Sequence, residues 1–129
     1  GLDERKYVEH APEQIFRYDT YHQKVPFRQR LMVRKDDTFL LAPKKYYRSL
    51  EPELMGTMAY IVYKDRLAML VWESQRAVII RNQAVADIFA RQFNFLWDRA
   101  HPVSPKAYNR LDDPGFVKKL KDKIRGRTP

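Results

Sequence analysis

Two residues near the N-terminus have the spacing of a catalytic motif. His22 and Lys24 match the first half of the H-x-K-x4-D pattern of phosphodiesterases, but Gln29 stands where that pattern requires an aspartate. Without the acid, the histidine lacks the partner that orients it and balances its charge. His22 also falls within a predicted helix, whereas the motif belongs on a strand. We therefore expect no catalytic role for His22.

Other enzymatic and cofactor-binding patterns are missing. The chain has only four glycines, at positions 1, 56, 115 and 126, which are too widely spaced for a glycine-rich phosphate loop. It contains neither a G-x-S-x-G elbow nor an H-E-x-x-H pair. There is no cysteine, and the three histidines are scattered, so a metal site is not expected. These absences predict a non-enzymatic protein without a cofactor.

Basic residues interleaved with aromatic ones are the candidates for nucleic-acid binding. Lysine and arginine can neutralise phosphates, and tyrosine can stack on unpaired bases. The alternative is a solvated basic surface whose tyrosines face the core, and no recognised nucleic-acid-binding motif decides between the two. The candidates come from the basic strand 27–35, the KKYYR segment and the C-terminal tail: Arg28, Arg30, Lys44, Lys45, Tyr46, Tyr47, Arg48, Lys118, Lys119 and Lys121.

The net charge of +9 is concentrated toward the C-terminus. From His101 onward there are eight Lys or Arg and three Asp, a net of +5, which leaves +4 for the first hundred residues. A basic face can attract nucleic acid or a membrane surface, and it can also be an ordinary solvated surface. No apolar run is long enough to span a bilayer and no signal peptide opens the chain, so we expect a cytoplasmic protein.

The central part of the chain predicts the fold. Three apolar runs, Met58–Tyr63, Leu67–Trp72 and Ala77–Ile80, are short, bounded by charges and rich in strand-forming residues. Both alternating faces of the first run are apolar, as in strands covered on both sides. Asn82 then caps an amphipathic helix, Gln83–Ala100. We predict an α/β (α+β) domain with a mixed, largely antiparallel sheet covered by this helix.

The flanking segments are less regular. Residues 1–11 are predicted to be a linker or an expression remnant, residues 12–100 the domain, and residues 101–129 a basic extension. Within the domain we expect a helix over 12–25, a one-sided strand over 27–34 with arginines on its outer face, a turn at 35–37, a strand over 38–42 and a short helix over 43–50. The extension should contain a short amphipathic helix from about Pro114, with its last four residues disordered.

The stretch Tyr47–Ala100 resembles the phospholipase D-like effector domain of prokaryotic transcriptional regulators of the TrmB type. The resemblance rests on the hairpin IVYKDRLAMLVWE, the strand AVIIRN and the helix QAVADIFARQFNFLWDRA. It implies a phospholipase D-like half domain in which the hairpin occupies the place of the catalytic strand. Thr57, Ala59 and Lys64 fall where the catalytic His, Lys and Asp would be. The resemblance therefore implies a domain without the catalytic triad.

Members of this family sense an effector or dimerise, usually beside a winged helix-turn-helix. The resemblance thus implies a non-enzymatic effector-sensing or oligomerisation domain of a transcriptional regulator, with a homodimer as the expected assembly and a small molecule as a possible effector. Arginine suits an anionic or hydroxylated ligand, and aromatic rings suit stacking or apolar contact. The expected ligand residues are Arg30, Arg34, Tyr60 and Trp72, the last two of which are alternatively core residues.

Overall fold

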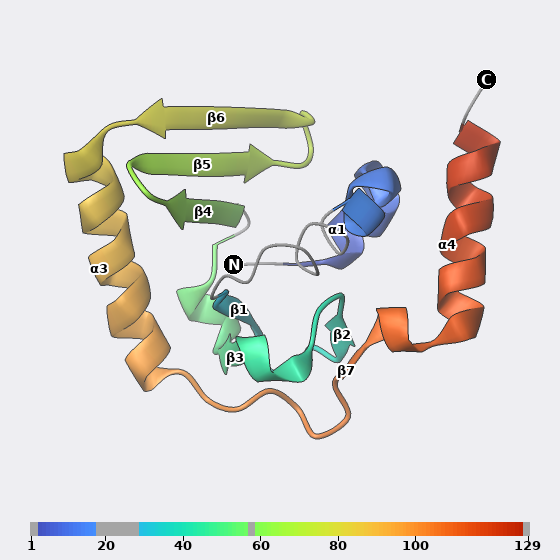
Figure 1. Ribbon diagram of the computed structural model, residues 1–129. Coiled ribbons are helices and arrows are strands. Elements are labelled where there is room, and N and C mark those ends of the chain that lie inside the picture. The colour runs from blue at the N-terminus through green and yellow to red at the C-terminus, as the bar shows by residue number, and fades with distance from the viewer. Residues whose placement is uncertain (1–2, 18–28, 57–58, 128–129) are drawn as a thin grey trace.

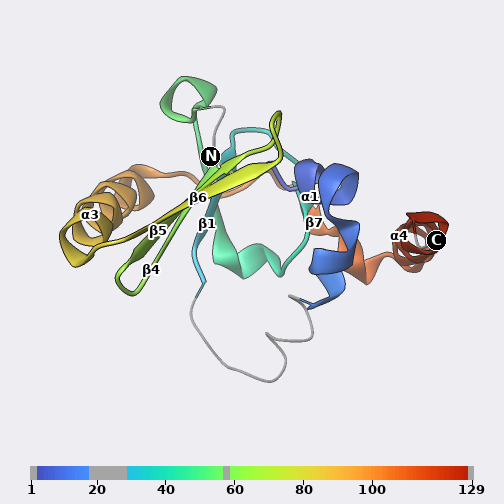
Figure 2. The same ribbon diagram turned by 90° about the horizontal axis from the view of Figure 1, so that it is seen from above.

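The computed structural model describes residues 3–17, 29–56 and 59–127. A three-stranded sheet lies at one end of the molecule, α3 and α4 stand on opposite sides, and short strands join the parts between them (Figures 1 and 2). The elements in order are α1 (Arg5–His10), a helical segment over 12–17, β1 (Leu31–Arg34), β2 (Phe39–Leu40), β3 (Tyr47–Leu50), β4 (Ala59–Tyr63), β5 (Arg66–Val71), β6 (Arg76–Arg81), α3 (Gln83–Arg99), β7 (Tyr108–Asn109) and α4 (Pro114–Arg127).

Strands β4, β5 and β6 form an antiparallel meander, which confirms the three strands predicted from the apolar runs. Lys64 and Gln75, in the two connecting turns, have positive φ angles of 51° and 52°. The helix α3 packs on one face of this sheet, where the rings of Tyr60 and Phe89 meet edge to face at 5.5 Å. The opposite face leaves Ile61 and Ile79 exposed, so the expectation of cover on both sides is wrong.

Among the described residues, three separate sheets replace the predicted single mixed sheet. Besides the meander, β1 pairs with β3 and β2 pairs with β7, and both pairs are parallel. The chain thus combines helices with parallel and antiparallel strands, and its α/β class is confirmed.

Strand β1 lies between two small hydrophobic cores, which corrects its prediction as a one-sided strand. Val33 packs with Leu40 and Tyr47, whereas the next side chain along the other face, Met32, packs with Leu50 and Met55. The second core also contacts the last two turns of α3. Of the predicted outward arginines, Arg34 at the strand's end and Arg30 just before the strand are exposed, and Arg28 lies outside the described residues.

The helix predicted over residues 43–50 is also wrong. Only Lys44–Tyr46 form a helical turn, of the 3₁₀ type, and residues from Tyr47 onward form β3. Tyr47, Ser49 and Leu50 are buried, so pairing with β1 and packing outweigh the local helical signal. A second 3₁₀ turn, Pro52–Leu54, follows β3. The predicted turn at 35–37 and the strand around Phe39 are confirmed.

The N-terminal segment expected to be a linker is folded against the domain. Residues Arg5–His10 form α1, whose Tyr7 and His10 pack on the Trp72 ring at centroid distances of 5.0 and 5.8 Å. Glu4 is buried, and its carboxylate accepts hydrogen bonds from the Tyr47 hydroxyl and the Leu41 N–H. The predicted helix over 12–25 is observed for residues 12–17, and the rest of it lies outside the described residues.

The C-terminal extension is likewise integrated. Ser49 and His101 form an antiparallel bridge, and β7 pairs with β2. The predicted amphipathic helix is α4, which buries Leu120 and reaches Arg127, so residues 126–127 are helical and not disordered. In the described part of the chain, no helix has the length and apolarity that crossing a membrane demands.

Candidate interaction surface

The four residues expected to bind a ligand do not converge. The Arg30 guanidinium lies 5.5 Å from the Phe93 ring centroid and 5.7 Å from that of Trp97, along α3. Tyr60 contacts Phe89 farther along the same helix, and partial burial raises the pKa of its phenol. Trp72 packs instead on α1, and Arg34 is exposed at the end of β1. Among the described contacts, none joins two of these four side chains.

The KKYYR segment does not present its aromatic rings to a ligand. Tyr47 is buried with its hydroxyl bonded to Glu4, and Tyr46 packs against the core beside Val33. Arg48 donates a 2.8 Å hydrogen bond to the Trp97 carbonyl, and its guanidinium lies 4.6 Å from that ring. Stacking of Tyr47 on a base is therefore a wrong prediction, because the ring belongs to the core.

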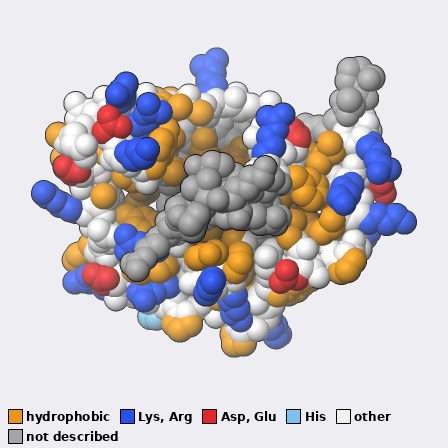
Figure 3. Space-filling view, viewed as in Figure 1, with side chains coloured by type: hydrophobic (Ala, Val, Ile, Leu, Met, Phe, Trp, Pro, Cys, Tyr) orange, Lys and Arg blue, Asp and Glu red, His pale blue; other side chains and the backbone are white. Residues whose placement is uncertain are grey.

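The remaining predicted bases are exposed but dispersed. Lys44 and Lys45 are exposed near β3, and Lys118, Lys119 and Lys121 are exposed on α4. On the face shown in Figure 3, Lys and Arg side chains are spread over many elements and interrupted by acids. The predicted Arg28 lies outside the described residues. The described bases thus form separate small groups.

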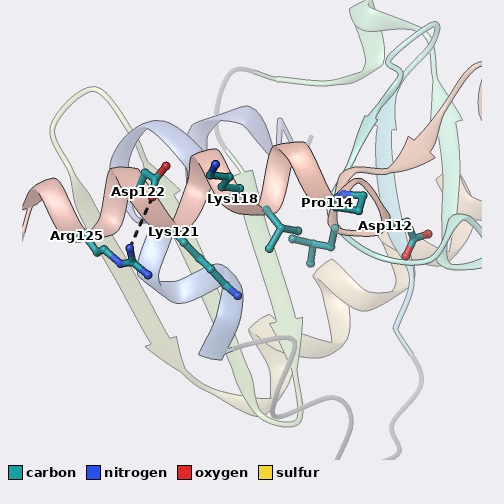
Figure 4. A pocket seen from close by; sticks show the side chains of 8 residues that line it. Asp112, Pro114, Lys118, Lys121, Asp122 and Arg125 are labelled. Carbon is teal, nitrogen blue, oxygen red and sulfur yellow. Dashed lines mark ion pairs between the residues drawn. The ribbon is translucent and has the colours of Figure 1, made fainter.

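A shallow groove of about 460 Å³ runs along α4 (Figure 4). Its lining has three basic and two acidic residues, and Asp122 lies 3.9 Å from Arg125. Its lining residues are Leu111, Asp112, Pro114, Val117, Lys118, Lys121, Asp122 and Arg125. None of the residues expected to bind an effector lines this groove. In the described part of the chain, no group of three or more His, Asp or Glu side chains is placed to hold a metal ion.

The most distinctive surface is apolar. Eight large hydrophobic side chains are exposed among the described residues, and six of them belong to the β4–β6 sheet and α3. Ile79 is 61% exposed, Phe95 55% and Ile88 51%. We call these six side chains together the apolar surface: Ile61, Tyr63, Val78, Ile79, Ile88 and Phe95. Ile61, Tyr63 and Ile79 lie on the sheet face opposite α3, Val78 lies on the face that α3 covers, and Ile88 and Phe95 lie on α3 itself. Ile61 and Ile79 lie in one row across the face opposite α3, on either side of Ala68. Adjoining exposed apolar residues of this kind mark interaction sites.

The sequence contained a signal for this surface. Both alternating faces of β4 are apolar, and so is the run from Ala77 to Ile80. Such a pattern predicts cover on both faces, but it does not tell whether the cover comes from the same chain. In the structure, α3 contacts β4 and β5, while β6 is the strand with the greatest exposure in the meander.

No family model, curated protein or solved structure matches this chain.

Proposed function

We propose that this chain is a non-enzymatic oligomerisation domain of a cytoplasmic transcriptional regulator. The observation that carries the proposal is the apolar surface. Large hydrophobic side chains that stay exposed to water are stabilised when another protein covers them, so they mark an interaction site. The resemblance to the phospholipase D-like effector domains of TrmB-type regulators supports the same conclusion, since those domains sense effectors or dimerise.

Between sensing and association, the geometry favours association. A sensor needs convergent polar groups around a cavity. The expected ligand residues instead contact separate elements, Arg30 and Tyr60 packing on α3 and Trp72 on α1, and the groove along α4 is shallow. A small-molecule effector bound by Arg30, Arg34, Tyr60 and Trp72 therefore has less support than a second protein on the apolar surface.

Sedimentation equilibrium between about 1 and 100 μM tests the proposal. The expected result is a mass approaching twice the 15.5 kDa of one chain. Raising the salt from about 50 to 500 mM should leave this association unchanged or strengthen it, because apolar contacts are not screened as ion pairs are. A monomer at every concentration would contradict the proposal.

The cationic face of α4 supports a second candidate, nucleic-acid binding. Lys118, Lys119 and Lys121 are all exposed on that helix. If this candidate is correct, a duplex or single strand should bind with an affinity that falls by orders of magnitude between about 50 and 200 mM salt. Replacing the three lysines by alanine should then weaken binding. Under the oligomerisation proposal, no such binding is expected at the lowest salt.

A further inference from the structure

Strand β6 is an open edge of the antiparallel sheet. The strand order is β4-β5-β6, so β6 pairs with β5 alone among the described strands, and five of its six residues are exposed. Its sequence, RAVIIR, is apolar between two arginines and contains no proline. A long, exposed, apolar edge offers unpaired backbone N–H and C=O groups to another strand.

The directions of these backbone groups follow from the register. The N–H of Asn82 donates to the Asp65 carbonyl at 2.8 Å, so the backbone groups of residue 82 point toward the β4–β5 hairpin. The pairing of β6 with β5 proceeds without a bulge, and backbone groups alternate in direction along a strand. The backbone N–H and C=O groups of Ile80, Val78 and Arg76 therefore point toward β5. Those of Ala77, Ile79 and Arg81 point away from β5, toward the open edge.

A second copy of the same strand matches this outward pattern. When two identical antiparallel strands pair about a two-fold axis, the axis passes through a residue that faces itself. With Ile79 on the axis, Ala77 faces Arg81 of the second copy, so every outward residue meets an outward residue. If the two-fold axis passed through Val78 instead, Arg81 would have to pair with Gln75 of the second copy. Gln75 has a φ of 52°, which is not a strand conformation.

The side chains also agree with this register. Ile79, the most exposed large hydrophobic side chain described, faces its own copy, and Val78 faces Ile80. Arg76 faces the neutral Asn82, so no two arginines are opposed. Arg81, for its part, is 3.2 Å from Asp65 within its own chain, which balances its charge.

We propose that two copies of this chain pair antiparallel through β6, with Ile79 on the two-fold axis, and so form a continuous six-stranded sheet. This inference rests on the proposed oligomerisation function and specifies its partner and geometry. The apolar face bearing Ile61 and Ile79 then continues from one copy into the other, because a two-fold axis perpendicular to the sheet keeps like faces on the same side.

Ile79→Lys tests the interface by placing two ammonium groups opposite each other on the axis. Leu54→Lys is the matched control, since Leu54 is 58% exposed but lies outside the meander. Sedimentation equilibrium should show at least a tenfold weaker dimer for Ile79→Lys and no change for Leu54→Lys. Circular dichroism should show both variants folded. Equal dimer strength in both variants would overturn the edge pairing.

A cysteine at the same position reports the register directly, because the chain has no cysteine of its own. Directly opposed residues in a hydrogen-bonded antiparallel pair have Cα atoms about 5.5 Å apart, within the range that a disulfide bridges. Ile79→Cys should form a covalent dimer under mild oxidation much faster than Leu54→Cys. Similar rates would overturn the register, while a dimer that persists without this cross-link leaves the oligomerisation proposal standing with another interface.

Discussion

Glu4 is a buried carboxyl group in a mainly apolar setting. It is 7% exposed, and burial raises its pKa from 4.5 to about 7, although hydrogen bonds from Tyr47 and Leu41 act in the opposite direction. Burial is also the main cause that raises the pKa of the Tyr47 phenol. The nearby Glu4 charge and the hydrogen bond to Glu4 raise it further. Both groups therefore keep their protons to a higher pH in the folded chain than in the unfolded one.

This residue makes stability depend on pH. Because the folded pKa of Glu4 exceeds the unfolded value, its contribution is fully present below about pH 4.5 and is lost as the pH rises through about 7. The loss amounts to about 3 kcal/mol at most. We expect urea denaturation to show that Glu4→Gln is nearly neutral at pH 5 and stabilising at pH 8.

Glu9→Gln provides the control, because the Glu9 side chain is 60% exposed. It should leave the pH dependence of the wild-type chain intact. If Glu4→Gln and Glu9→Gln showed the same pH profile, the buried carboxyl would not be the source of the dependence.

At the level of elements, the start of α3 is determined by one side chain. The Asn82 side-chain oxygen accepts a 3.1 Å hydrogen bond from the Val85 N–H, which would otherwise have no partner in the first turn. Asn82→Ala should lower the free energy of unfolding by about 1 kcal/mol in chemical denaturation. Asn94→Ala, at an exposed position inside the same helix, should have no such cost. Equal losses would argue against a capping role.

The elements that could be predicted are those whose signal is local. The hairpin, β6 and α3 each follow from apolar periodicity, turn residues and a cap within a few positions. Strand β3 could not be recognised in the same way, because its conformation depends on pairing with β1 and on burial of Tyr47. The pairing of β2 with β7 spans most of the chain, and nothing in either dipeptide indicates its partner.

At the scale of the whole molecule, Phe39 connects three segments that are distant in sequence. The guanidinium groups of Arg5 and Arg110 lie 5.1 and 5.3 Å from its ring centroid, and the Phe116 ring packs edge to face at 5.7 Å. Phe39→Ala should cost about 2 to 4 kcal/mol. Hydrogen exchange should accelerate in α1 and α4 while β5 stays protected.

Leu54→Ala is the comparison for this change, since Leu54 is 58% exposed and lies outside the apolar surface. It should alter the free energy of unfolding by less than about 0.5 kcal/mol. Uniform acceleration of exchange across the whole chain in Phe39→Ala would show instead that the ring supports one cooperative core.

The candidate surface could be predicted only in part. The apolar character of both faces of β4 and of β6 is present in the sequence, but which face α3 covers depends on the packing of Tyr60 against Phe89. For the basic residues, the sequence showed how many there are but not how they are distributed in space. Their number was evident, yet Arg48 is committed to Trp97 and the exposed lysines lie on separate elements, which sequence proximity does not indicate.

The parallel pairing of β2 with β7 also has a consequence for synthesis on the ribosome. Residues Phe39–Leu40 cannot pair until Tyr108–Asn109 have been translated, whereas β4, β5, β6 and α3 are contiguous and their pairings are local. Local contacts form faster than distant ones. The meander and α3 should therefore fold on the nascent chain first, so that the edge of β6 is present before the first half of the domain has closed.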